Sequence, residues 1–211
     1  MYKITRSPAS EPQILKEKSK EWTEKFLEKR QQNPTHKLSW RKGATNYHDE
    51  IVKALGSLTH NHCSYCDKYP LDERGKIDLQ IDHFKPISKP EFTRLAYDWT
   101  NLFLACGGCN KPKLAQYSDL ILRPDADDYN PSDYFLFDTS SGEILINERN
   151  GIVHTERAKE TIKVFNLNDK SIIKMRLRAI RNFRREMTNP IEEFDINDYD
   201  YRNFIEELLY F

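Results

Sequence analysis

The chain has 211 residues, of which 38% are hydrophobic and 31% charged, and its 33 basic side chains balance 33 acidic ones. This length fits one compact domain or a core with helical extensions, and the chain has no apolar run of the ~18 residues that a membrane-spanning helix needs. The first residues lack the apolar centre of a signal peptide, so we expect a cytoplasmic protein without a membrane partner.

The charges are arranged in blocks, although they cancel over the whole chain. Residues 152–188 carry ten basic and four acidic side chains, whereas residues 189–211 carry one basic and seven acidic ones. Nucleic acid can therefore bind locally to a protein that is not basic overall. The alternative is that these blocks are a solvated helix face and an acidic tail.

Two helices are expected before the first cysteine. Residues 14–32 form a charged helix that ends before Pro34, and its apolar side chains recur along one side: Leu15, Trp22, Phe26 and Leu27. Residues 47–58 form the second helix, with Asn46 as its N-terminal cap.

A pair of strands and a short helix are expected next. Residues 77–82 alternate apolar and polar side chains, which predicts a strand with one buried face. The apolar run at residues 101–106 can pair with that strand. The polar stretch from Asn110 predicts a short helix, in which Pro112 is tolerated only in the first turn. Together these elements make a small ββα unit.

The rest of the chain predicts a hairpin and further helices. Residues 134–147 form the hairpin and turn at Asp138–Gly142. The helices follow in order: residues 154–168, residues 169–187 with Pro190 as the stop, and residues 199–211. Within residues 169–187 an apolar stripe is expected, made of Ile173, Leu177, Ile180 and Met187, with arginines on the other faces: Arg176, Arg178, Arg181, Arg184 and Arg185.

The expected fold class is therefore α+β and rich in helix. We divide the chain into an N-terminal helical region (1–59), a ββα core (60–118), and a region with the hairpin and the C-terminal helices (119–211).

All four cysteines fall in two Cys-x-x-Cys pairs: Cys63 with Cys66, and Cys106 with Cys109. In a reducing compartment such pairs bind metal as thiolates, and four sulfurs complete the tetrahedron of Zn²⁺ without a histidine or a water. The sequence therefore predicts a closed structural zinc site that clamps the segment between the pairs. A thioredoxin-like redox pair is the alternative, but it does not explain two pairs. His60 and His62 are expected at the surface or hydrogen-bonded around the site.

Asp82 and His83 are neighbours at the end of the predicted strand, so their side chains leave opposite faces. The carboxylate can hold a hard divalent cation while the imidazole takes a proton from water. Asn110 directly follows the second cysteine pair, and its amide oxygen is a candidate second ligand for that cation. Such an open site leaves positions for phosphate oxygens and water, which suits Lewis-acid catalysis of phosphodiester hydrolysis.

Three more polar residues lie in the same segment. Asn101 precedes the second strand, and its amide can hold the backbone around Asp82 and His83. Lys111 and Lys113 lie at the start of the helix expected from Asn110, where free N–H groups favour anions, so both are candidate phosphate contacts. Each residue alone is a weak signal, and their order between the two cysteine pairs is what points to a nuclease.

The chain resembles the zinc-containing HNH endonucleases in three stretches: the first Cys-x-x-Cys pair, DHFKP from Asp82, and WTNLFLACGGCNKPK up to Lys113. The resemblance implies a ββα-metal core with structural Zn²⁺ on the four cysteines and catalytic Mg²⁺ or Mn²⁺. It implies that His83 is the general base, that Asp82 and Asn110 bind the catalytic metal, and that Asn101 is the central loop-holding residue. Asn110 stands where many members have histidine, which affects metal preference.

A looser resemblance continues from residue 97 into the C-terminal helices. It is to the PtuB-type HNH proteins of Septu and retron-linked anti-phage systems, and it implies a PtuA-type ATPase as partner. The main interpretation is therefore a metal-dependent HNH endonuclease that acts on DNA, the family's usual substrate. RNA such as tRNA is an alternative substrate. The alternative from another class is a non-catalytic zinc-knuckle adaptor that joins nucleic acid to an ATPase.

Overall fold

The computed structural model describes residues 1–40, 47–73, 76–188 and 193–210. In chain order its α-helices and strands are α1 (Gln13–Gln32), α2 (Tyr47–Thr59), β1 (Asp72–Glu73), β2 (Lys76–Ile77), β3 (Gln80–His83), β4 (Leu102–Ala105), α3 (Gly107–Lys113), α4 (Pro131–Tyr134), β5 (Phe135–Phe137), β6 (Ile144–Ile146), α5 (Ile152–Val164), α6 (Lys170–Glu186) and α7 (Arg202–Leu209). Short 3-10 helices lie at Pro8–Ser10, Pro90–Leu95, Trp99–Asn101, Glu148–Asn150 and Ile196–Asp198. No helix within the described ranges is long and apolar enough to cross a membrane.

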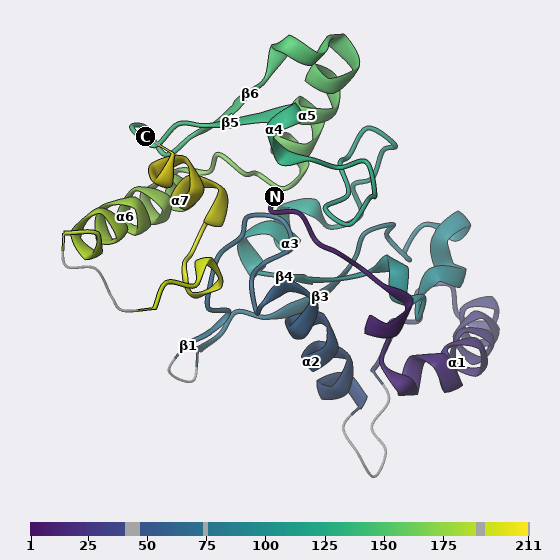
Figure 1. The fold of residues 1–211 in the computed structure, drawn as a ribbon. Helices are drawn as coiled ribbons and strands as arrows, with labels where there is room; N and C mark the ends of the chain where they lie inside the picture. Colours follow the sequence, from purple (N-terminus) through teal and green to yellow (C-terminus); the bar gives the residue numbers. More distant parts are fainter. Residues whose placement is uncertain (41–46, 74–75, 189–192, 211) are drawn as a thin grey trace.

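Strands β3 and β4 lie at the centre of the molecule, with α2 below them and α3 above them in the view of Figure 1. The two strands are antiparallel, with Ile81 opposite Leu104 and Asp82 opposite Phe103. All four residues of β4 are buried. Strands β3 and β4 pair with each other, and α3 follows β4 directly in the chain. The predicted ββα core and the mixed helix and small-sheet fold are therefore confirmed.

Strand β3 has a different burial from the one predicted. It spans only Gln80–His83, and its buried residue is Asp82, whereas Ile81 is half-buried. Side chains two residues apart leave the same face of a strand, so Gln80 and Asp82 share a face. Helix α3 contacts β3 on this face through side chains of both residues. The expectation of one buried apolar face was wrong because a helix covers the polar face as well.

Helix α3 begins at Gly107, three residues before the predicted start, and ends at Lys113. Asp78 Oδ1 accepts a hydrogen bond of 2.8 Å from the Gly107 amide, so a side chain from before β3 satisfies the free N-terminus of the helix. The second cysteine pair itself therefore supplies the first turn. Pro112 lies in the last turn, so its predicted place in the first turn was wrong. The helix starts earlier than predicted because Asp78, which is distant in sequence, caps it at Gly107.

The remaining elements pack around this core. The predicted hairpin is formed by β5 and β6, with Phe137 opposite Ile144, and its turn is closed by Asp138, which accepts hydrogen bonds from Ser140 and Ser141. Helix α7 begins at Arg202 rather than at residue 199. Two predicted features, the Asn46 cap and the Pro190 stop, lie outside the described residues.

One cluster of buried apolar side chains joins the regions of the chain. It includes Leu15 of α1, Leu55 of α2, Phe103 of β4, Phe165 after α5 and Phe204 of α7. Tyr65, between the first two cysteines, stacks on Phe165 with ring centroids 3.8 Å apart. The segment between the cysteine pairs is therefore packed into the centre of the protein, in contact with the C-terminal region.

Candidate metal centre and catalytic site

The four cysteine sulfurs meet at one point between the end of α2 and the junction of β4 with α3. All four Sγ atoms lie within 4.8 Å of one another, and each cysteine is at most 5% exposed. Cys66 Sγ and Cys106 Sγ, one from each pair, are 3.6 Å apart. Zinc–sulfur bonds of about 2.3 Å in a tetrahedron separate sulfurs by roughly 3.8 Å. The donor set and its spacing fit one structural metal ion such as Zn²⁺.

Backbone contacts hold the two cysteine turns in place. The Cys106 amide donates to Cys63 Sγ over 3.3 Å, and the Asp67 amide donates to the Cys63 carbonyl over 2.9 Å. A Cβ on Gly107 would lie 3.0 Å from Asp78 Oδ1, so glycine lets this carboxylate reach the start of α3. Local structure therefore positions the sulfurs.

His62 is fully buried beside Cys63, whereas His60 is exposed. His62 Nδ1 lies 2.7 Å from the His60 carbonyl oxygen, and Nε2 lies 3.0 Å from the carbonyl oxygen of Tyr199. Its ring also stacks on Tyr69, with centroids 4.5 Å apart. Because its nitrogens face carbonyl oxygens, His62 joins the first cysteine turn to the C-terminal segment and is not a metal ligand.

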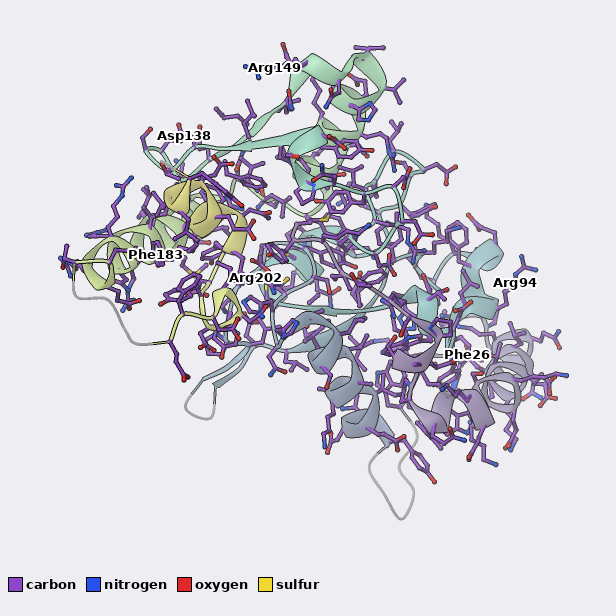
Figure 2. All side chains as sticks on the ribbon, viewed as in Figure 1. Phe26, Arg94, Asp138, Arg149, Phe183 and Arg202 are labelled. Carbon is purple, nitrogen blue, oxygen red and sulfur yellow. The ribbon has the colours of Figure 1, made fainter. Side chains whose placement is uncertain are left out.

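The C-terminal segment is fixed to the same turn by a buried ion pair. Arg202 Nη2 lies 2.6 Å from Asp67 Oδ1, and the Arg202 amide donates to Asp67 Oδ2 over 2.6 Å. The Tyr69 amide donates to Asp200 Oδ1 over 2.7 Å. Figure 2 shows Arg202 in the interior, where α7 approaches the central strands. These contacts bring residues from the end of the chain against the metal centre.

Asp82 is enclosed by two hydrogen-bond donors. Tyr65 Oη donates to Asp82 Oδ2 over 2.5 Å, and Lys113 Nζ lies 3.0 Å from Asp82 Oδ1. Burial, followed by the Asp82 carboxylate, raises the pKa of Tyr65 well above its usual range, so this hydroxyl stays protonated and donates. Burial lowers the pKa of Lys113, while Asp82 acts in the opposite direction. The carboxylate is thus held in one orientation toward α3.

His83, the next residue, leaves the opposite face of β3 and is half-buried. Its Nε2 lies 2.9 Å from the carbonyl oxygen of Ala96. A carbonyl oxygen only accepts, so Nε2 carries the proton and Nδ1 has the free lone pair. Trp40 lies parallel to the ring, with an angle of 4° between the planes and 6.1 Å between centroids. Burial lowers the pKa of His83 from its usual value of 6.5, which favours the neutral base.

Asn101 holds the loop that follows β3. Its Oδ1 accepts from the Lys85 amide over 2.8 Å, and its Nδ2 donates to the Lys85 carbonyl over 3.0 Å and to the Leu95 carbonyl over 3.3 Å. The Asn101 carbonyl also accepts from the Phe84 amide. The side chain is 3% exposed, so it contacts backbone and not solvent. These bonds fix the chain on both sides of the loop between His83 and Ala96.

Helix α3 places the remaining predicted residues. Asn110 Nδ2 donates to Gln80 Oε1 over 2.6 Å, so Asn110 faces the same side of β3 as Asp82. Lys113 is fully buried and also donates to the His83 carbonyl over 2.7 Å. A phosphate can reach Lys113 only if its ion pair with Asp82 opens. Lys111, by contrast, is exposed on the same helix.

Sequence reasoning missed three contributors to this site. Tyr65 and Gln80 bind the two predicted metal ligands, and Trp40 lies against the predicted base. Gln80 could have been found, since it is two residues before Asp82 on a strand and so shares its face. Tyr65 lies inside the first Cys-x-x-Cys turn, where no periodic pattern indicates its direction. Trp40 reaches His83 only through tertiary packing.

Comparison with known protein families matches the segment that contains this site. Residues 63–116 match the family model described as HNH endonuclease. No curated protein matches the chain. The matched segment begins at the first cysteine and includes both cysteine pairs, β3, β4 and α3. Together with the clustered sulfurs, this match shows that residues 63–116 form an HNH endonuclease domain with a four-cysteine metal site.

Proposed function

We propose that this protein is a divalent-cation-dependent endonuclease that hydrolyses phosphodiester bonds in nucleic acid. The observation that carries the proposal is the state of His83 within the HNH domain. Its Nε2 is bound to the Ala96 carbonyl, and burial disfavours its protonation, so Nδ1 is available to take a proton from water. The alternative, an adaptor without catalysis, gives no role to the combination of His83 with Asp82, Asn101 and Asn110 between the two cysteine pairs.

Asp82 and Asn110 are the residues proposed to hold the catalytic cation, Mg²⁺ or Mn²⁺. They fit such an ion because a carboxylate and an amide supply hard oxygen ligands, and both side chains lie between β3 and α3. When bound, the cation supplies Lewis-acid stabilisation of charge at the phosphate. Tyr65 orients Asp82, and Asn101 keeps the His83 loop in position.

Lys111 and Lys113 are proposed to contact phosphate in different ways. Lys111 is exposed and can approach the nucleic-acid backbone directly. Lys113 holds Asp82 Oδ1 in this structure, so its ammonium would be available to phosphate only if this ion pair opened. The four cysteines are proposed to bind Zn²⁺ as a structural ion, separate from the catalytic one.

The finer features of the function are also proposals. DNA is the proposed substrate, as the resemblance to HNH endonucleases suggests, and structured RNA such as tRNA is the second candidate. The likeness to PtuB-type proteins supports a cytoplasmic role in anti-phage defence with a PtuA-type ATPase. The acidic block of residues 189–211 is a candidate for contact with that partner.

The test is cleavage of plasmid DNA and of total tRNA by the purified protein, with Mg²⁺, Mn²⁺ or EDTA. We expect cation-dependent cutting of one substrate and its loss in His83→Ala, with zinc content and circular dichroism unchanged. Full activity in His83→Ala would show that His83 is not the general base. If the wild-type protein cuts neither substrate alone or with the PtuA-type ATPase, the proposed activity is wrong.

A further inference from the structure

Helix α6 has two faces of different character. Its buried residues, Ile172, Arg176, Ile180 and Phe183, recur at helical spacing and face the protein. Phe183, labelled on α6 in Figure 2, is 2% exposed and packs edge-on against Tyr199, with ring centroids 5.2 Å apart. The helix lies at the left edge of the view in Figure 1, far from α1. Its other face is therefore available to solvent or to a partner.

That outer face carries an uninterrupted row of cations. We name it the α6 stripe, and it consists of Lys170, Lys174, Arg178, Arg181 and Arg185. The steps of four, four, three and four residues keep the row on one side of a helix, roughly opposite the buried face at ~100° per residue. All five side chains are exposed, and no ion pair among the described residues includes any of them. The stripe is a one-sign surface without internal neutralisation.

Helix α1 shows what a merely solvated helix looks like in the same protein. It is also long and highly charged, but lysines and glutamates alternate along it. Glu21 forms ion pairs with Lys18 and Lys25. In α6 only Glu186 is acidic. Like charges at i,i+4 spacing repel one another, and the α6 stripe contains no acidic side chain that offsets this repulsion as the glutamates of α1 do. Such a row is stabilised when a polyanion lies along it.

The dimensions of the α6 stripe fit a nucleic-acid backbone. From Lys170 to Arg185 it is about 22 Å long at ~1.5 Å per residue. A duplex carries one phosphate charge per ~1.7 Å, or about 13 charges over that length. We propose that the α6 stripe binds the phosphate backbone of nucleic acid, as a second contact outside the HNH domain. The proposal rests on the proposed nuclease function, and it adds where the substrate is held.

The composition of the stripe favours nucleic acid over a protein partner. Protein interfaces are centred on buried aromatic or aliphatic anchors with few charges at their core. The five stripe residues are all lysine or arginine and provide no such anchor. Contacts to phosphate need only cations of this kind. Met175 of α6 and Met187, which caps its C-terminus, are exposed, but neither belongs to the row. The stripe therefore lacks the apolar centre of a protein docking site.

The experiment measures binding without cleavage, so it uses the His83→Ala protein in buffer without added divalent cations. The probes are a labelled DNA duplex of about 20 base pairs and labelled tRNA, each titrated over a series of salt concentrations. The variant carries Arg178→Gln, Arg181→Gln and Arg185→Gln. The matched control carries three exposed lysine changes on α1: Lys16→Gln, Lys20→Gln and Lys29→Gln.

Each phosphate contact contributes about 0.9 to the slope of log K against log salt on duplex DNA, so loss of three contacts lowers the slope by about 2.7. We expect this fall for the α6 variant and no fall for the α1 control. If the parent binds and the α6 variant keeps the slope of the parent to within about 0.9, the stripe proposal is wrong although the nuclease proposal stands. If the parent binds neither probe, the stripe proposal is also wrong, and the cleavage test with added cation decides the nuclease proposal separately.

Discussion

Both members of the Asp82–Lys113 ion pair are buried, with side-chain exposures of 6% and 0%. Burying two charges costs several kcal/mol per ion, and their attraction returns this only if the other hydrogen-bonding groups are satisfied. Here Tyr65 donates to the second oxygen of Asp82, and the His83 carbonyl accepts from Lys113. The pair is therefore a fully bonded network, and removal of one member leaves the other charge without its partner.

Lys113→Met is expected to destabilise the cation-free protein by about 3–5 kcal/mol, because Asp82 then remains buried as an unpaired carboxylate. The matched control is Lys111→Met, an exposed change on the same helix, which is expected to stay within about 0.5 kcal/mol of wild type. Urea unfolding without added divalent cations measures both. Equal midpoints and slopes for the two variants would mean that the ion pair contributes nothing to stability.

The protonation of His83 predicts the acid limb of the pH–rate profile. The proposed base works only when neutral, and burial lowers its pKa from 6.5, so protonation stops cleavage only at a pH below that value. We expect the cleavage rate to fall about tenfold per pH unit below a midpoint that lies under 6.5. Rates from pH 5 to 8 at saturating cation test this. A midpoint above 6.5 would contradict the assignment.

Helix α6 shows which structural features its helical periodicity predicts correctly and which it does not. The helix forms where it was predicted, over Lys170–Glu186. The predicted apolar stripe was only partly right, because Arg176 is fully buried and Met187 is 52% exposed. The Arg176 guanidinium lies over the rings of Tyr201 and Phe204 and donates to the Gly142 carbonyl. These partners come from distant parts of the chain, which helical spacing cannot reveal.

In the candidate site, too, features set by local spacing could be predicted and tertiary contacts could not. The cysteine cluster could be predicted, because the spacing of two Cys-x-x-Cys pairs reflects the geometry of one tetrahedral ion. The catalytic roles of the predicted residues stay predictions. The partners of Asp82 could not be predicted, since Tyr65 and Lys113 reach it from opposite ends of the domain. Lys113 was expected to face phosphate, and only the packing of α3 on β3 shows that its side chain points inward.

Docking of the C-terminal segment depends on Arg202. Arg202→Ala is expected to cost about 3–5 kcal/mol of unfolding free energy, because Asp67 is then left buried without its cation. Asp67 follows Cys66, so we also expect faster transfer of zinc to a coloured chelator. Arg149→Ala is the control, since Arg149 is exposed at the far edge of the molecule in Figure 2. Equal zinc-transfer rates in both variants would show that the Arg202–Asp67 contact does not affect how firmly the cysteines hold zinc.

The four-cysteine cluster brings together two segments that lie 40 residues apart in sequence, and both segments contact the core. Structural zinc contributes about 10–16 kcal/mol in small zinc-binding peptides, which is similar in size to the stability of a typical domain, about 5–15 kcal/mol. We expect one zinc ion per chain, and we expect its removal by a strong chelator to abolish the cooperative thermal transition. Circular dichroism melting before and after metal removal measures this; an unchanged transition would show that the metal is dispensable for folding.

The position of β4 has a consequence for hydrogen exchange. All four of its residues are 0% exposed, β3 pairs with one edge, and the Leu104 carbonyl accepts from the Ser64 amide in the first cysteine turn. Amide protons of such a strand exchange with solvent only when the whole protein opens, whereas those of a peripheral helix also exchange through local opening. Nucleic acid bound along α6 should therefore slow exchange there by more than it slows exchange in β4, so mass spectrometry of the two peptides can separate local protection from global stabilisation.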